Sequence, residues 1–277
     1  MKIKKHLSTI ILVLIFAVGL GLLLYPTLSN YWNTLHQSRA IASYTEQVDN
    51  LEDDEYNRIL GEAKAYNAMI SAKGNRRSLS DAEMQVYNKL LDPSGTGVMA
   101  YIDIPIIGVS LPVYHGVSDA VLQVATGHIE WSALPVGGES THCVLSGHRG
   151  LPSAKLFTNL DKLGEGDVFM LHVLKETFTY QVDQILIVEP HETEDLNIIS
   201  GGDYCTLVTC TPYGINSHRL LVRGHRIENL EEDEVLIITA DASQIDPILV
   251  APVVAAPILF ALFIYLMIKY RKRKNKK

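Results

Sequence analysis

Hydrophobic residues are spread unevenly along the 277-residue chain and divide it into segments of different character. An apolar run occupies 10–25, and a second run, 248–268, contains no charged residue. At about 1.5 Å per residue, a helix of the second run's length crosses a ~30 Å hydrocarbon core. We therefore expect a transmembrane helix over 248–268. The shorter first run, within a segment covering 1–30, predicts either an uncleaved anchor or a cleaved signal peptide.

The segment 31–97 has the pattern of a helical region. Only one glycine and no proline occur between residues 36 and 73, where Glu, Asp, Ala and Leu are frequent, so helix is expected to about residue 73. Ser80 and Glu83 have the spacing of a capping box, which predicts the start of another helix. That helix should end near Leu91, just before Asp92 and a proline.

From residue 98 to 228 the helical pattern gives way to short apolar runs bounded by glycine, proline, asparagine and histidine. This spacing predicts an all-β barrel or sandwich. Short helices fit at 118–126 and 154–163, and 229–247 is expected to be a linker to the C-terminal span. The expected strands are 100–104, 111–114, 143–146, 168–174, 177–188, 204–210 and 219–226.

The charges predict a topology. Three of the 24 basic residues precede the first apolar run and seven lie in the tail at 269–277, whereas all 31 acidic residues lie between the two runs. Basic residues beside a span favour the cytoplasmic side, so both termini are expected in the cytoplasm and the middle of the chain outside the cell. An acidic exterior part argues against nucleic acid as a partner, because phosphate binding needs clustered positive charge.

The three cysteines are Cys143, Cys205 and Cys210. An odd count in an exported domain leaves at least one thiol unpaired. Cys205 and Cys210 differ in parity along one expected strand, so their side chains should lie on opposite faces. We expect Cys143 and Cys205 to be core thiols, with a disulfide between them as the open alternative. Cys210 ends its strand at a turn, which makes it the candidate nucleophile.

A hairpin model gives Cys210 a partner. If the turn 212–217 closes a symmetric hairpin, Thr211 lies opposite His218 and Cys210 lies opposite Arg219, with Cβ atoms ~4.5–5.5 Å apart. Arg223 shares that face but lies ~13 Å further along the strand. A guanidinium beside the sulfur would stabilise a thiolate, and it could donate to a carbonyl oxygen as negative charge develops there.

Ten histidines compete for the role of general acid and base. His148 follows Leu145-Ser146-Gly147 at the end of an apolar run, which places it at the edge between a strand and a loop. His115 and His128 also lie beside glycines and remain candidates at this point. The chain has no Cys-x-x-Cys pair, so no zinc site of that type is indicated, and no metal or cofactor is implied.

These segments resemble the sortase family of cysteine transpeptidases. Thr206-Leu207-Val208-Thr209-Cys210 is similar to the family's TLxTC signature, and Arg219 and His148 occupy the positions of its catalytic arginine and histidine. The resemblance continues through 101–105, 111–116, 134–138 and up to Arg226, in a consistent order over about half of the chain. It implies an eight-stranded β-barrel, and it selects His148 among the histidines.

Within the family, the C-terminal apolar run and the segments 147–153 and 210–214 resemble class C, the pilin-polymerising sortases. This implies a catalytic domain on the outer face of a Gram-positive membrane. It also implies cleavage of an LPxTG-type sorting signal through an acyl-thioester, with transfer to a lysine amine of a pilin subunit. One departure concerns the lid of class C enzymes: 71–80 has no Asp-Pro-aromatic anchor, so a standard anchored lid is not expected, although the loop 74–80 could still cover the cleft.

Two other functions stay open on sequence alone. A cell-wall-anchoring sortase would use a peptidoglycan amine as the acceptor. This function stays open because the active-site residues do not determine which amine is the acceptor. A non-catalytic membrane-anchored module would use the acidic barrel only as a protein-binding face. The intact set of Cys210, His148 and Arg219 argues against the second.

Overall fold

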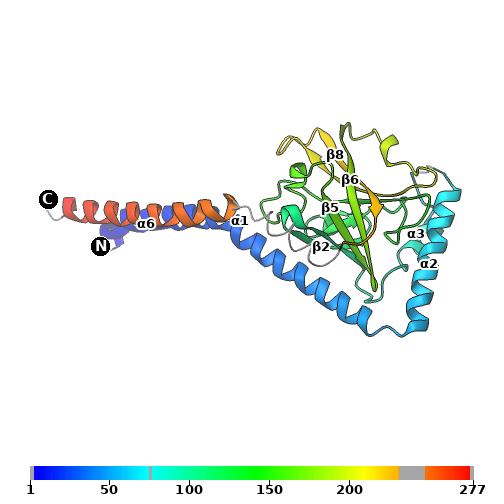
Figure 1. Cartoon of the computed structure of the whole chain (residues 1–277). Coiled ribbons are helices and arrows are strands. Elements are labelled where there is room, and N and C mark those ends of the chain that lie inside the picture. Colours follow the sequence, from blue (N-terminus) through cyan, green and yellow to red (C-terminus); the bar gives the residue numbers. More distant parts are fainter. Residues whose placement is uncertain (1–2, 75–76, 231–246, 275–277) are drawn as a thin grey trace. The chain divides into compact units, whose positions relative to one another are not determined.

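A computed structural model of the chain describes residues 3–74, 77–230 and 247–274. It separates into two compact units, one made from 1–32 and 244–277 and the other from 33–243 (Figure 1). The helices are α1 (Ile3–Asp49), α2 (Asp53–Ala72), α3 (Asp81–Tyr87), α4 (Asp119–Leu122), α6 (Pro247–Lys274) and the 3-10 turns η1 (Pro105–Ile107), η2 (Leu160–Lys162) and η3 (Glu194–Leu196). The strands are β1 (Val98–Ile104), β2 (Val109–His115), β3 (Thr126–His128), β4 (Thr141–Ser146), β5 (Val168–Val173), β6 (Glu176–Val188), β7 (Asp203–Thr211) and β8 (His218–Ile227).

The strands form a closed barrel in the order β1-β2-β3-β4-β7-β8-β6-β5. This confirms the eight-stranded barrel that the family resemblance implied. The seven strands expected from the sequence are all present, and the one that was not expected, β3, has only three residues and carries no visible alternation. The β2–β3 and β4–β7 pairs are parallel. A parallel pair needs a long crossover, and between β4 and β7 the chain supplies it by adding β5 and β6 to the barrel.

The helical region differs from the expectation in two places. The helix expected to run through residue 73 is interrupted, because α1 ends at Asp49 and α2 begins at Asp53. The capping box at the start of α3 is confirmed: the Glu83 N–H donates to Ser80 Oγ at 3.4 Å, and the Ser80 N–H donates to Glu83 Oε2 at 2.6 Å. Helix α3 ends at Tyr87, short of the expected Leu91. The short helix expected over 154–163 is reduced to η2.

Buried polar side chains attach these helices to the barrel. On α2, Asn67 Nδ2 donates to the Leu134 carbonyl at 3.0 Å while Asn67 Oδ1 accepts from the Leu134 N–H at 2.7 Å. On α1, the Tyr44 hydroxyl accepts from the Leu174 N–H at 2.7 Å and donates to the Met99 carbonyl at 3.0 Å. Burying a polar group costs free energy unless it is hydrogen-bonded, so each pairing favours one position of its helix on the barrel.

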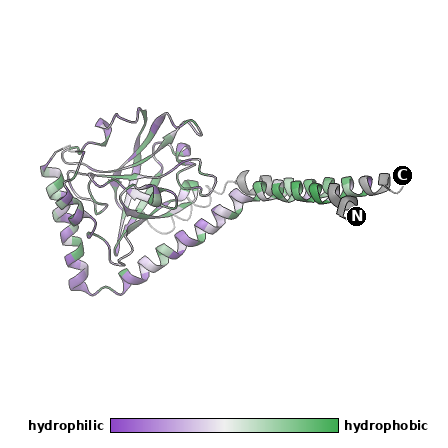
Figure 2. Ribbon diagram, turned by 180° about the vertical axis from the view of Figure 1, so that it is seen from behind, coloured by the Kyte–Doolittle hydropathy of each residue, from purple (hydrophilic) through white to green (hydrophobic). Residues whose placement is uncertain are grey.

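The other unit is built from helices whose residues are mostly hydrophobic, as the green colouring in Figure 2 shows. Helix α1 contains a stretch long and apolar enough to cross a membrane, so the first apolar run belongs to a longer helix than the sequence indicated. In α6 the apolar part described with its side chains, Val254–Lys269, is shorter than the ~20 residues that a span needs. The structure therefore shows an apolar helix there and not clearly a span. The rings of Phe16 and Phe263 stack with centroids 4.3 Å apart.

Most of the expected linker 229–247, and the end of the basic tail, lie outside the described residues.

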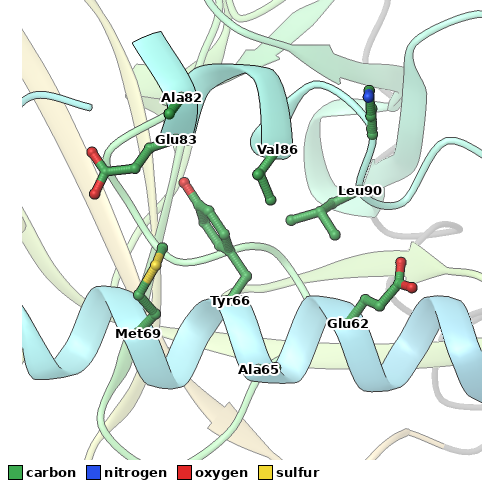
Figure 3. A pocket seen from close by; sticks show the side chains of 9 residues that line it. Glu62, Ala65, Tyr66, Met69, Ala82, Glu83, Val86 and Leu90 are labelled. Carbon is green, nitrogen blue, oxygen red and sulfur yellow. The ribbon is translucent and has the colours of Figure 1, made fainter. Parts of the chain in front are cut away.

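An open apolar groove of about 570 Å³ lies between α2 and α3 (Figure 3). Tyr66 and Met69 of α2 face Val86 and Leu90 across it, with Glu62 and Glu83 among its few charged residues. None of its lining residues belongs to β4, β7 or β8. The groove is therefore separate from the strands that carry the candidate nucleophile and its neighbours.

We expect Tyr44→Phe to lower the free energy of unfolding of the full chain in detergent by ~1–3 kcal/mol, because it leaves two buried backbone groups without their partner. Chemical denaturation measures this. Tyr56→Phe is the matched control, since its hydroxyl donates to Glu176 in an exposed position, and we expect a change within about 0.5 kcal/mol. Equal effects in the two variants would contradict the anchoring role of Tyr44.

Candidate active site

Strands β7 and β8 place Cys210 and Arg219 opposite each other. The register pairs Cys210 with Arg219 and Thr211 with His218, which confirms the hairpin expected from the sequence. The turn between the strands uses left-handed backbone at Gly214 (φ 74°) and Asn216 (φ 61°), which these residue types tolerate best. Because the register is set along the whole β7–β8 pair, the two residues are brought together by the ladder and not by the turn alone.

Strand β4 brings His148 to the other side of Cys210. The parallel register pairs Ser146 with Val208, and the next bonds continue it: the Gly147 N–H donates to the Val208 carbonyl at 3.0 Å. Thr209 Oγ1 then donates to the Gly147 carbonyl at 2.7 Å. β4 ends at Ser146, and continuing its register by two residues puts His148 level with Cys210 at the same rim. Three neighbouring strands thus end in a row of His148, Cys210 and Arg219.

The row lies on the outer face of the barrel wall. Cys210 is partly exposed, whereas Cys205 and its register partner Cys143 are buried in the barrel interior. Both interior thiols are free, so the alternative of a Cys143–Cys205 disulfide is wrong for this structure. Burial raises the pKa of the Cys205 thiol well above its usual range. The accessible thiol is the one in the row.

Among the described residues, no hydrogen bond joins the side chains of His148, Cys210 and Arg219. Arg219 Nη1 instead donates to the His218 carbonyl at 3.1 Å and to the Asn216 carbonyl at 3.4 Å. The turn thus holds the guanidinium at the rim. Catalytic hydrogen bonds are often loose without substrate and tighten when it binds, so the row is compatible with a site that a bound carbonyl group would complete.

The two other candidate histidines have structural partners. His128 is fully buried, with Nδ1 2.9 Å from the Tyr87 hydroxyl and Nε2 2.8 Å from the Ala133 carbonyl. His115 has its ring nitrogens against the carbonyls of Gly97 and Leu90, at 3.0 and 2.7 Å. Neither lies in the row with Cys210. Within the described part of the chain, no group of three or more His, Cys, Asp or Glu side chains is arranged to hold a metal ion.

Arg149 is a neighbour of the site that sequence reasoning missed. Its Nη1 donates to Thr211 Oγ1 at 3.2 Å, it forms an ion pair with Asp161, and its guanidinium lies 5.9 Å from the ring centre of Tyr213. It therefore ties the segment that follows His148 to the end of β7. The only sequence signal was its place directly after the candidate histidine.

Gly147 is required by packing rather than by its φ angle. A Cβ added there would lie 2.6 Å from Cδ2 of the fully buried Phe157. The Phe157 N–H donates to the His148 carbonyl at 3.1 Å, so the ring belongs to the structure that supports the histidine. A glycine at this position lets β4 lie against the ring and carry His148 to the rim.

The comparisons with known proteins agree with this geometry. The family model described as "Sortase domain" matches residues 102–227. Sortase C1 from Streptococcus agalactiae is 52% identical, with a TM-score of 0.68, and the match covers 69% of this chain and all of that chain. The chain belongs to the sortase family.

Further relatives place this sortase within the family. Its solved neighbours at 40–52% identity are class C sortases. One is sortase C from Clostridium perfringens, solved with the C-terminal cell wall sorting motif: 43% identity, TM-score 0.62, covering 69% of this chain and all of that one. Sortase D of Bacillus subtilis is 27% identical over 159 residues, 56% of this chain and 76% of the relative. The protein is thus a cysteine transpeptidase of the sortase type, class C by its structural neighbours.

We expect Gly147→Ala to reduce cleavage of a sorting-signal peptide by at least about tenfold, since a side chain at 2.6 Å from a buried ring must displace β4 or Phe157. Steady-state kinetics of the full chain in detergent measures this. Gly164→Ala is the control, because its added Cβ would meet nothing closer than 4.0 Å. Wild-type activity in Gly147→Ala would show that the position of His148 does not depend on this contact.

On the same outer face, His142 is a buried histidine at the far end of β4 from the row. Its Nδ1 lies 2.8 Å from the Asn197 carbonyl, which can only accept, so Nδ1 carries the proton and Nε2 accepts from Thr206 Oγ1 at 2.7 Å. Burial lowers the pKa of His142 from 6.5 to about 4, and nearby Arg223 and Arg77 add to the effect. The His142 ring is therefore neutral, and in this form it donates to the Asn197 carbonyl.

The depressed pKa of His142 predicts acid sensitivity. Between pH 6.5 and about 4 the unfolded chain binds a proton at this position that the folded chain does not, so the free energy of unfolding should fall as the pH falls through that window. Denaturation at a series of pH values should show a flatter profile for His142→Gln than for the wild type. His191→Gln is the control, because His191 is an exposed histidine whose contact is with the exposed Glu189. Parallel wild-type and His142→Gln profiles would contradict this assignment.

Proposed function

We propose that this sortase joins pilin subunits by transpeptidation, with Cys210 as nucleophile, His148 as general acid and base, and Arg219 as the group that stabilises negative charge. The observation that carries the proposal is the row of these three residues at the ends of β4, β7 and β8. The identity with class C sortases, higher than with the curated sortases A and D, supports the class.

In the first half of the reaction, the Cys210 thiolate attacks the threonine carbonyl carbon of an LPxTG-type sorting signal. The carbonyl oxygen becomes an oxyanion, which Arg219 stabilises. When this intermediate collapses, the bond to the glycine nitrogen breaks and the leaving amine takes a proton from the His148 imidazolium. The products are an acyl-thioester on Cys210 and the free C-terminal peptide.

In the second half, the neutral amine of a lysine of the next pilin subunit attacks the thioester carbonyl, and neutral His148 accepts the proton that the attacking nitrogen loses. A second oxyanion forms at the same position beside Arg219, and the Cys210 thiolate leaves when this intermediate collapses. An isopeptide bond replaces the thioester, and the enzyme returns to its starting protonation state. No metal or cofactor takes part in either half.

The electrostatic role of Arg219 is compatible with its present contacts. A guanidinium has five N–H donors in a fixed planar arrangement. Among the described residues, Arg219 donates to the turn carbonyls of Asn216 and His218 through Nη1. The turn therefore orients the group while other donors serve the substrate oxygen. A lysine has a single ammonium nitrogen, so it could not bond the turn with one nitrogen and the substrate oxygen with another.

The proposed partners are pilin subunits that carry LPxTG-type sorting signals, together with the membrane, and no nucleic acid. The apolar stretch of α1 serves as an N-terminal anchor within segment 1–30, and the run 248–268 as a second span that ends in the cytoplasmic tail at 269–277. The helical region 31–97, the barrel 98–228 and the linker 229–247 then lie outside the cell. The three lysines before the first apolar run and the seven basic residues at 269–277 support this orientation, because basic residues beside a span favour the cytoplasmic side.

The central test is Cys210→Ala in the full-length protein, incubated with purified pilin. We expect no acyl-enzyme by mass spectrometry and no SDS-resistant ladder of pilin polymers. A thiol-reactive probe applied to the folded protein should label the wild type and Cys205→Ala but not Cys210→Ala, because Cys143 and Cys205 are buried.

Each result has a separate meaning. Polymer formation by Cys210→Ala would exclude Cys210 as the nucleophile. An acyl-enzyme without ladders, released instead by a peptidoglycan amine, would keep the chemistry and replace polymerisation with wall anchoring. No turnover by a wild type whose Cys210 is labelled would favour a non-catalytic binding module.

A further inference from the structure

The connection between α2 and α3 makes a specific contact through Arg77. Its Nη2 donates to the Thr193 carbonyl at 2.6 Å and also to Asn197 Oδ1, and its Nε donates to Thr193 Oγ1 at 3.2 Å. Thr193 and Asn197 are the two residues that flank η3. One side chain from the N-terminal region therefore holds both ends of this turn.

Trp131 completes the seat of Arg77. The guanidinium lies over the indole ring, 4.4 Å from its centre, a favourable geometry for a cation and an aromatic face. Tyr66 of α2 donates to the carbonyl of Glu130, the residue before this tryptophan, at 3.1 Å. The planar fork of arginine can stack and donate to several acceptors at once, which a lysine ammonium cannot do.

The turn that Arg77 holds packs against the wall that carries the active site. Leu196 of η3 is buried in a small cluster with Val144, Val208 and Leu221. Val208 lies two residues before Cys210, and Leu221 two residues after Arg219, so alternation along the strands puts all four on the same outer face. The segment 189–202, between β6 and β7, is therefore fixed on the face where a peptide must lie to reach Cys210.

A second contact joins the same segment to strand β4 of the barrel. The Asn197 carbonyl accepts from His142 Nδ1 at 2.8 Å, while the Asn197 side chain accepts from Arg77. Asn197 is thus held by the barrel wall on one side and by the N-terminal region on the other. Removing the Arg77 side chain would leave the hydrogen bond between Asn197 and His142 and remove the one between Asn197 and Arg77.

We propose that Arg77 is a positioning residue for the sorting-signal peptide: it fixes the segment 189–202, through η3, in the shape that borders the binding surface beside Cys210. The inference rests on the proposed function. It also gives the α2–α3 connection, which lacks the Asp-Pro-aromatic anchor, a role through the contact of Arg77 with the β6–β7 segment.

The test compares Arg77→Ala with wild type in the full-length protein in detergent, using a peptide that carries an LPxTG-type sorting signal. We expect KM to rise by about tenfold and kcat to change by less than about twofold, because the reacting groups are untouched and only the binding surface loosens. Hydrogen exchange in 189–202 should become faster. The rate at which a small thiol reagent alkylates Cys210 should not change.

Arg58→Ala is the matched control. Arg58 lies exposed on α2 and pairs with Glu55 and Glu62 of the same helix, so its loss should alter neither KM nor exchange in 189–202. Asn197→Ala should also raise KM. The double variant should be no worse than Arg77→Ala by more than about twofold, because the contact that Asn197→Ala removes is one of those that Arg77→Ala already removes. Additive losses would overturn the proposed coupling.

Arg77→Lys keeps the charge and removes the fork, so it should raise KM to an intermediate value, and it serves as the deciding variant if Arg77→Ala does not fold. If these variants have the wild-type KM, or if exchange in 189–202 is unchanged, the inference is wrong. A wild type that is alkylated at Cys210 but does not cleave the peptide would instead refute the proposed function.

Discussion

The row of His148, Cys210 and Arg219 depends on one constraint, the hydrogen-bonded register between β7 and its two neighbours. Parallel pairing with β4 and antiparallel pairing with β8 bring three chain segments to the same rim, and a shift of one residue in either pair would turn a side chain to the other face. Thr209 protects this register at the critical point, because its buried hydroxyl bonds the Gly147 carbonyl next to His148. Further along β7, the Thr206 hydroxyl bonds the His142 side chain of β4, which is a second link between the same two strands.

The N-terminal helices are part of the catalytic unit and not an appendage to it. Tyr44 and Asn67 pair with backbone groups of the barrel, and Arg77 reaches the segment between β6 and β7. Each of these contacts joins residues more than fifty positions apart in the chain. Together they mean that the surface beside Cys210 is shaped by residues on elements that supply no group to the proposed chemistry. Variation in the helical region can therefore alter substrate binding while the row stays the same.

Some features were predictable because their signals are local. The capping box at Ser80 needs only two side chains three residues apart, and the Cys210–Arg219 pairing needs only a short turn and alternating strands. The break between α1 and α2 was not predictable in this way, since the stretch around residues 50–52 lacks glycine and proline and the helices turn there in order to pack on the barrel. Arg77 and Arg149 resembled ordinary surface arginines, and their partners are distant in sequence.

The sequence by itself determined the apolar ends and the β-rich middle, and it singled out Cys210 as the candidate nucleophile. The signals for these features, which are hydrophobic period, charge and strand parity, act over a few residues. The sequence also indicated His148, but only through a resemblance to known sortases. The tertiary structure decided which histidine stands beside Cys210, that the two interior thiols stay free, and that η3 is held from both sides. These outcomes depend on barrel closure and on a parallel crossover of more than fifty residues, which no local pattern encodes.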